Sequence, residues 1–145
     1  TFKIQYDSAV TAIVKIHGEL DYQVHEHFKV SLAANYRKFT LASSKEPWHR
    51  PNFDFKTSAF YKIGDKIRFH TDIMGYSQRK ALDGMGEAKD LDGIIDLNFG
   101  IDYSFSNAFT AYFNFNNILA QEYEYWNNYP RQGFHVMGGV KLNLF

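Results

Sequence analysis

Residues 95–105 alternate between apolar and polar side chains almost without a break. Successive side chains of a β-strand point to opposite faces, so this segment predicts a strand with one apolar and one polar face. The apolar set is Ile95, Leu97, Phe99, Ile101, Tyr103 and Phe105. The opposite set is Asp96, Asn98, Gly100, Asp102 and Ser104. A tilted transmembrane strand needs roughly 9–11 residues, and this segment is long enough to be one.

The same two-faced pattern recurs along the whole chain. It predicts six further strands, over residues 2–22, 28–36, 53–63, 67–75, 109–115 and 136–144. The sequence therefore predicts an all-β, antiparallel fold. We expect the apolar set of every strand to face lipid and the polar set to face a lumen.

The connections between the predicted strands alternate strictly between short and long. The short ones lie near residues 24–27, 64–65 and 106–107, and the long ones span residues 41–51, 81–90 and 120–133. Outer-membrane barrels have short periplasmic turns and longer extracellular loops. The pattern therefore predicts that the three long loops are extracellular and that the last strand ends in the periplasm.

Composition removes several other classes of protein. No stretch approaches the roughly 18 apolar residues of a membrane helix, and the mean hydropathy is −0.40. A β-barrel remains compatible with that value, because its lumen-facing residues are polar. The 16 basic and 16 acidic residues balance, so no net field favours nucleic acid as a partner. The absence of cysteine excludes disulfides and thiolate metal sites within this sequence.

The number of strands sets an expectation about the domain. Bacterial single-chain barrels have an even number of strands, eight or more, and seven strands that start outside the cell cannot close one. We therefore expect residues 1–145 to be the C-terminal part of one larger outer-membrane β-barrel domain. The expected partners are the remaining strands of that barrel and the lipid of the outer membrane.

The third long loop carries the candidate ligand-binding residues. Tyr125, Trp126, Tyr129 and Arg131 combine aromatic faces with a guanidinium donor, and nearby asparagines add amides, a set that suits sugars or chelates. The alternative is an aromatic girdle at the membrane interface, where amphipathic rings lie at headgroup depth. The girdle is the favoured interpretation for Tyr123 and Tyr125.

The polar face carries charges of both signs on neighbouring strands. Such charges can pair across a sheet, so we expect them chiefly to brace and solvate the lumen, with a ligand path as the alternative. They are Lys15, His17, Glu19, Arg37, Asp54, Lys56, Arg68, His70, Asp72, Asp96 and Asp102.

Catalytic and metal-binding motifs are not evident. His25 and His27 flank Glu26 at a tight turn, but zinc needs three or four ligands, so a solvated turn is favoured over a metal site. No serine lies in a G-x-S-x-G motif. Gly84 and Gly86 have no predicted helix after them, so they do not form a phosphate-binding motif. We expect no enzymatic activity, no cofactor and no metal.

The pattern becomes most specific in the last third of the chain, which contains an Asn-Asn-Ile-Leu element at residues 116–119. It also contains residues 96–100, 113–115, Tyr123, Trp126, Tyr129-Pro130, Gly133-Phe134 and residues 138–140. Together these resemble the C-terminal barrel strands of TonB-dependent receptors, and the resemblance extends with less detail back to roughly residue 48. It implies an outer-membrane location and, in that family, energised import of a bulky ligand such as a metal chelate or a glycan.

Three functions therefore stay open at this point. The first is ligand uptake by a barrel of the TonB-dependent receptor type. The second is a structural or accessory barrel of an outer-membrane complex, whose partners would be other outer-membrane or periplasmic subunits. The third is a soluble β-barrel or sandwich carrier, which would bury the apolar set in its interior instead.

Overall fold

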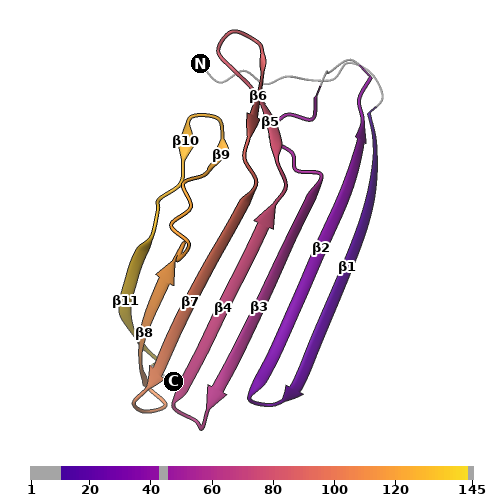
Figure 1. Cartoon of the computed structure of the whole chain (residues 1–145). Coiled ribbons are helices and arrows are strands. Elements are labelled where there is room, and N and C mark those ends of the chain that lie inside the picture. Colours follow the sequence, from indigo (N-terminus) through magenta and orange to yellow (C-terminus); the bar gives the residue numbers. More distant parts are fainter. Residues whose placement is uncertain (1–10, 43–45, 144–145) are drawn as a thin grey trace.

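The computed structural model describes residues 11–42 and 46–143, and within these ranges the regular structure consists of strands alone. Seven strands form one antiparallel sheet (Figure 1). They are β1 (Ala12–His25), β2 (Phe28–Thr40), β3 (Phe53–Ile63), β4 (Ile67–Tyr76), β7 (Ile94–Ser104), β8 (Phe109–Asn116) and β11 (His135–Leu142). The expected strand segments at residues 2–10 and at residue 144 lie outside the described residues.

Each strand of this sheet pairs with the next one along the chain, apart from the short hairpins inserted between them. The order is β1-β2-β3-β4-β7-β8-β11, so the predicted succession of seven antiparallel strands is confirmed. The sheet is not closed into a barrel, and β1 and β11 form its two edges. The fold shown is an open, all-β antiparallel sheet.

Two of the predicted long loops contain short hairpins that the alternation did not predict. One is β5 (Arg79–Leu82) with β6 (Ala88–Leu91), and the other is β9 (Glu124–Trp126) with β10 (Tyr129–Pro130). In the first hairpin the Asp83 carboxylate accepts the backbone N–H groups of Met85 and Glu87, both at 2.8 Å, which closes the turn. Both hairpins lie at the same end of the sheet, opposite the short turns (Figure 1).

The register of the sheet keeps the two faces separate across every strand pair. On β4 and β7, Asp72 lies opposite Asn98 and Ile73 lies opposite Leu97. On the neighbouring strand pairs, too, residues of the polar face lie opposite residues of the polar face, and those of the apolar face opposite those of the apolar face. A slip of one residue in any pair would move a whole set to the other face. The expected assignment of side chains to an apolar and a polar face is therefore continuous over the sheet.

On β7 the apolar face is the more exposed of the two. On β7, Ile95 is 50% exposed, whereas the adjacent Asp96 is 2% exposed. Tyr103 and Asp102 show the same inversion, with the tyrosine exposed and the aspartate buried. A sheet of a water-soluble protein normally buries its apolar face and wets its polar one.

Aromatic rings stack across the strands of the apolar face. The ring centroids of Phe69 and Phe99 lie 6.1 Å apart, and those of Phe99 and Phe115 lie 6.4 Å apart. Such cross-strand pairs stabilise a sheet and fix its register. In the part of the chain that is described, no helix is long and apolar enough to span a membrane.

Candidate functional site

The three long connections pack against one another at one end of the sheet. We call residues 46–51, 79–92 and 121–131 the loop cluster. The His49 N–H donates to the carbonyl of Lys80 at 2.7 Å, and the Asn127 N–H donates to His49 Nε2 at 3.4 Å. The His49 ring lies 4.9 Å from the Trp126 ring. One histidine thus joins all three segments.

The two hairpins are also joined directly. Asn127 donates its side-chain amide to the carbonyl of Leu82 at 3.4 Å and accepts from Lys89 Nζ at 3.1 Å. Asn128 in the tight β9–β10 turn has a φ of 67°, a left-handed conformation that asparagine tolerates better than most residues. Asn128 therefore allows the tight turn, and Asn127 holds the two hairpins together.

Arg79 is buried in the loop cluster, with 4% of its surface exposed. Its Nη2 donates to the carbonyl oxygens of Asp92 at 3.1 Å and Glu124 at 3.0 Å, while its buried Nε has no partner. Burial lowers the pKa of the guanidinium from its usual value. The side chain therefore ties the start of the first hairpin to the segment before β7 and to β9.

The structure places the four predicted ligand-binding residues in two pairs. The Arg131 guanidinium lies 5.6 Å from the centre of the Tyr125 ring, a cation–π arrangement. Trp126 pairs with Tyr129 across the β9–β10 hairpin, and both side chains are exposed, Tyr129 to 69%. Tyr125 is half-buried. Their contact with a ligand stays a prediction.

The girdle interpretation of Tyr123 and Tyr125 is wrong in this structure. Tyr123 is buried, and its hydroxyl donates to the Asp96 carboxylate on the polar face. The Tyr125 hydroxyl lies 3.6 Å from the sulfur of Met74, also on the polar face, and its ring packs edge-on against Tyr123. The loop folds back over the polar face, so neither ring lies on the apolar side. Burial, and then the bond to Asp96, raises the pKa of the Tyr123 hydroxyl far above 10.0.

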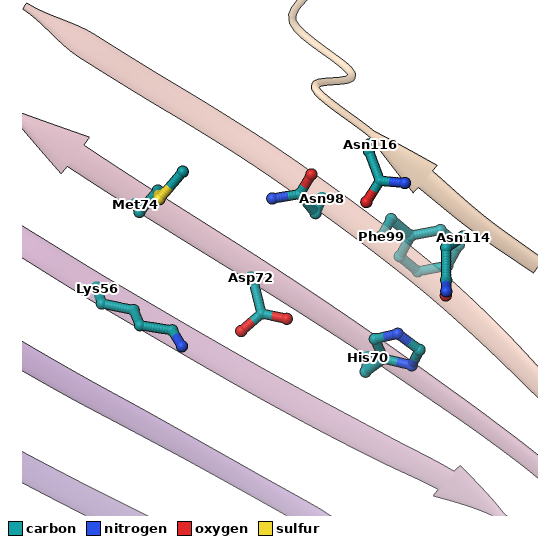
Figure 2. Close-up of a pocket in the computed structure, with 8 residues that line it drawn as sticks. All are labelled: Lys56, His70, Asp72, Met74, Asn98, Phe99, Asn114 and Asn116. Carbon is teal, nitrogen blue, oxygen red and sulfur yellow. The ribbon is translucent and has the colours of Figure 1, made fainter. Parts of the chain in front are cut away.

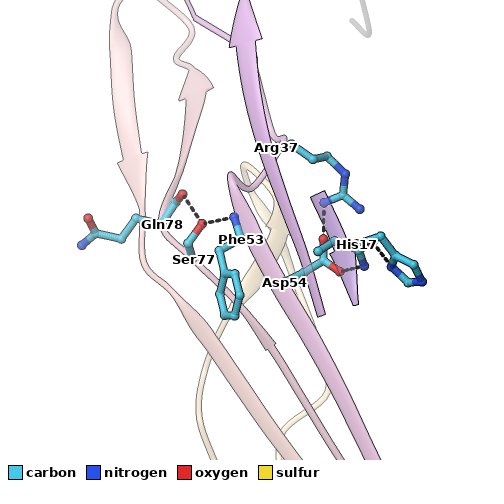
Figure 3. A network of polar contacts seen from close by, with 7 residues as sticks. His17, Arg37, Phe53, Asp54, Ser77 and Gln78 are labelled. Carbon is cyan, nitrogen blue, oxygen red and sulfur yellow. Dashed lines mark hydrogen bonds and ion pairs between the residues drawn. The ribbon is translucent and has the colours of Figure 1, made fainter. Parts of the chain in front are cut away.

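Part of the polar face is internally paired, as the mixed charges predicted. Arg37 on β2 forms an ion pair with Asp54 on β3, and Asn35 donates to the same carboxylate at 2.8 Å (Figure 3). His17 Nδ1 lies 2.7 Å from the Asn35 oxygen, which extends the network to β1. Between β1 and β2, the Lys29 ammonium also lies 3.4 Å from the Asp21 carboxylate.

A pocket of about 320 Å³ opens on the polar face between β3 and β8. Figure 2 shows its polar side chains, which come from four strands. They are Lys56, His70, Asp72, Asn98, Asn114 and Asn116. A smaller pocket of about 130 Å³ shares His70 and Asp72 and reaches Phe60 and Lys29. We call the two together the polar groove.

Metal-binding geometry is not found among the described residues. No group of three or more histidine, cysteine, aspartate or glutamate side chains within them is placed to hold an ion. His25 and His27 lie at the β1–β2 turn, and both are exposed.

Sequence reasoning missed His49, Arg79 and the role of Tyr123. All three act through contacts with residues distant in the chain, such as the bond between Tyr123 and Asp96 over 27 positions. One local signal was available for Tyr123, since its partner Asp96 stands on a predicted strand and an aspartate is costly to bury unpaired. Arg79 lies outside the predicted loop of residues 81–90.

The comparisons with known proteins give a structural likeness alone. No protein-family model matches the chain, and no curated protein matches it. A similar solved structure is that of the FpvAI–pyocin S2 complex, in which FpvAI is a TonB-dependent receptor. The TM-score is 0.79 at 11% sequence identity, and the match covers 91% of this chain but only 19% of that chain. At this identity the likeness concerns the fold of the sheet alone, and the chain spans about a fifth of the length of that structure's chain.

Proposed function

We propose that this chain forms part of the wall of an outer-membrane β-barrel of the TonB-dependent receptor type, which takes up a ligand across the outer membrane. The observation that carries the proposal is the inverted polarity of β7, with Ile95 exposed on one face and Asp96 buried on the other. A barrel wall in a membrane needs an apolar face toward lipid and a polar face toward its lumen.

The arrangement of the connections supports an orientation for this wall. The loop cluster gathers at one end of the sheet and the short turns at the other (Figure 1). With long loops outside and short turns in the periplasm, the loop cluster faces the medium. Trp126, Tyr129 and Arg131 are then placed for the first contact with a ligand.

The two edges of the sheet define the partners in this proposal. β1 and β11 each have one side without a neighbouring strand in the described sheet. Unpaired backbone groups facing hydrocarbon cost several kcal/mol each, so a sheet in a membrane must be closed. Further strands of the same barrel complete the wall, and the proposal assigns no enzymatic step and no cofactor to these residues.

Cysteine labelling on intact cells tests location and orientation together. These 145 residues contain no cysteine, and the unsubstituted protein controls for cysteines elsewhere. Met85 is 91% exposed in the β5–β6 hairpin, and Asp65 is exposed in the β3–β4 turn. We expect a membrane-impermeant maleimide to label Met85→Cys on intact cells and Asp65→Cys only after the outer membrane is permeabilised. Labelling in the reverse order would overturn the topology.

Uptake is tested separately by deleting the gene and restoring it. We expect the deletion to abolish growth on at least one bulky nutrient supplied as sole source, and restoration to recover that growth. An accessory barrel predicts the opposite combination, with no nutrient phenotype and the loss of another outer-membrane protein from its complex.

A further inference from the structure

Three polar side chains of the polar groove have no partner within the described sheet. On β1 to β3, Arg37 and Asp54 pair with each other and with neighbouring polar groups. In the groove, by contrast, Lys56, His70 and Asp72 make no side-chain hydrogen bond or ion pair with other described residues. Other groups of the groove are paired: Asn98 Oδ1 accepts the N–H of Asn117 at 3.0 Å, and Lys29 lies 3.4 Å from Asp21. The three side chains without a partner lie together in the larger pocket.

Asn114 shows that this lack of partners extends to a buried atom. Its Oδ1 is buried at the wall of the groove and has no hydrogen-bond partner among the described residues. A buried acceptor left unsatisfied costs about 1–3 kcal/mol, so such atoms usually have a partner from solvent or a ligand.

Gly100 is buried under two of the side chains that line the groove, His70 and Asn114. It lies on the polar side of β7, opposite His70 on β4 and Asn114 on β8. A Cβ at this position would collide with the His70 ring and with Asn114 Oδ1. Glycine weakens the interior of a strand, and it often marks a place where another group must approach closely. Here it lets two polar side chains from neighbouring strands converge over the same point.

We propose that the polar groove is a binding subsite for a neutral, polyhydroxylated molecule of about one or two sugar rings. In the larger pocket Lys56 and Asp72 carry opposite charges, so this pocket favours no ion of either sign. Carboxamides both donate and accept hydrogen bonds, as do hydroxyl groups, and three asparagines line the larger pocket. A volume of about 320 Å³ lies at the lower end for small-molecule sites.

The smaller pocket adds an apolar surface to this polar set. Phe60 lies on the polar face of β3, opposite His70 on β4. Its neighbours on the same face of β3, Ser58 and Lys62, are polar. An aromatic ring beside hydrogen-bonding groups suits a ligand that has an apolar C–H face and a hydroxylated rim. A polypeptide strand, by contrast, would be expected at an edge of the sheet, where backbone groups are free.

This subsite rests on the proposed function, because the polar face must line a space that a solute can enter. We would test it on the intact protein, purified in a detergent without sugar headgroups, by titration calorimetry with maltose, cellobiose and lactose. We expect saturable binding of at least one of these, with a Kd on the order of 1 mM.

Two variants and a control locate the binding. Gly100→Ala forces the His70 ring and the Asn114 amide out of their positions in the wall, and Asn114→Ala removes the unpartnered acceptor without adding bulk. We expect each to weaken binding about tenfold, as the loss of one to two hydrogen bonds would. Gly18→Ala is the matched control, because a Cβ there meets nothing within 4 Å, and it should leave the Kd unchanged.

The possible outcomes separate this inference from the proposed function. No saturable binding of any of the three sugars, binding of a Gly-Ser peptide instead, or equal binding by Asn114→Ala would overturn the subsite. Correct labelling of Met85→Cys in the same protein would then leave the proposed function standing. Failure of that labelling would overturn the proposed function whatever the titration shows.

Discussion

His49 is held in the loop cluster by a contact that only its neutral ring can make. Its Nε2 accepts the N–H of Asn127, and a protonated imidazole has no acceptor. Burial, and then the charge of Arg79, lowers the pKa of His49 below its ordinary 6.5. The contact is therefore favoured at neutral pH.

We predict that the loop cluster loosens in mildly acidic solution. Because the folded pKa of His49 lies below the unfolded one, the unfolded state binds more protons as the pH falls. The contribution of His49 to stability is present above pH 6.5 and is lost as the pH falls through the folded pKa. The protection factors of residues 124–131, which are corrected for the intrinsic pH dependence of exchange, should fall over this range. In His49→Asn, which fits the positive φ of this position, these protection factors should no longer change with pH.

The hydrogen bond from Tyr123 to Asp96 gives a second prediction at the scale of a residue. The Asp96 side chain is 2% exposed, and among the described residues Tyr123 is its one hydrogen-bond partner. Its Oδ1 has no partner. Tyr123→Phe therefore leaves the buried carboxylate without a hydrogen bond. We expect a loss of about 1–3 kcal/mol in the free energy of unfolding. Tyr129→Phe, at an exposed hydroxyl, is the matched control and should change little. Equal unfolding midpoints in urea for the two variants would contradict the assigned contact.

Among the strands, β7 has the sharpest contrast between its two faces. Ile101 and Asp102 are neighbours in sequence, yet they pair with Phe69 and Arg68 respectively, on opposite faces of β4. Each face thus continues across the strand boundary.

Substitution of these two neighbours tests which face meets lipid. If Ile101 lies near the middle of the membrane, Ile101→Arg should cost about 2–4 kcal/mol of stability. Asp102→Asn changes the charge by the same amount on the other face, where the ion pair to Lys141 is long at 3.9 Å and should contribute little. Comparable losses for the two variants in refolding from urea into bilayers would count against the assigned faces.

The whole sheet is incomplete at both edges. All 14 residues of β1 are exposed, which is unusual for a strand of this length because such an edge invites pairing with another strand. The proposed function therefore requires further strands to cover β1 and β11.

We predict that residues 1–145 expressed alone do not form a defined monomer. Refolded in detergent, they should aggregate or give a species without heat-modifiable migration in gels, because the edges stay open. The intact protein, refolded in parallel, serves as the control. A protease-resistant, heat-modifiable monomer of the isolated residues would show instead that they close on themselves.

The alternation of side chains by itself determined the strands, their faces and the short turns. β3, predicted over residues 53–63, has the bounds Phe53–Ile63, and β4, predicted over residues 67–75, has the bounds Ile67–Tyr76. The cause is local, because a strand with one apolar and one polar face requires apolar and polar residues to alternate with a period of two in the sequence. The order of the strands also follows, because short connections place successive strands side by side.

The tertiary structure alone decided how the long connections fold and what they contact. The two hairpins, the place of His49 among three segments and the turn of Tyr123 toward Asp96 all depend on partners distant in sequence. The convergence of His70 and Asn114 over Gly100 likewise needs the register of three strands. A period within one strand fixes which face a side chain takes. Its neighbour on that face depends on the pairing of strands, and that pairing is a property of the folded sheet.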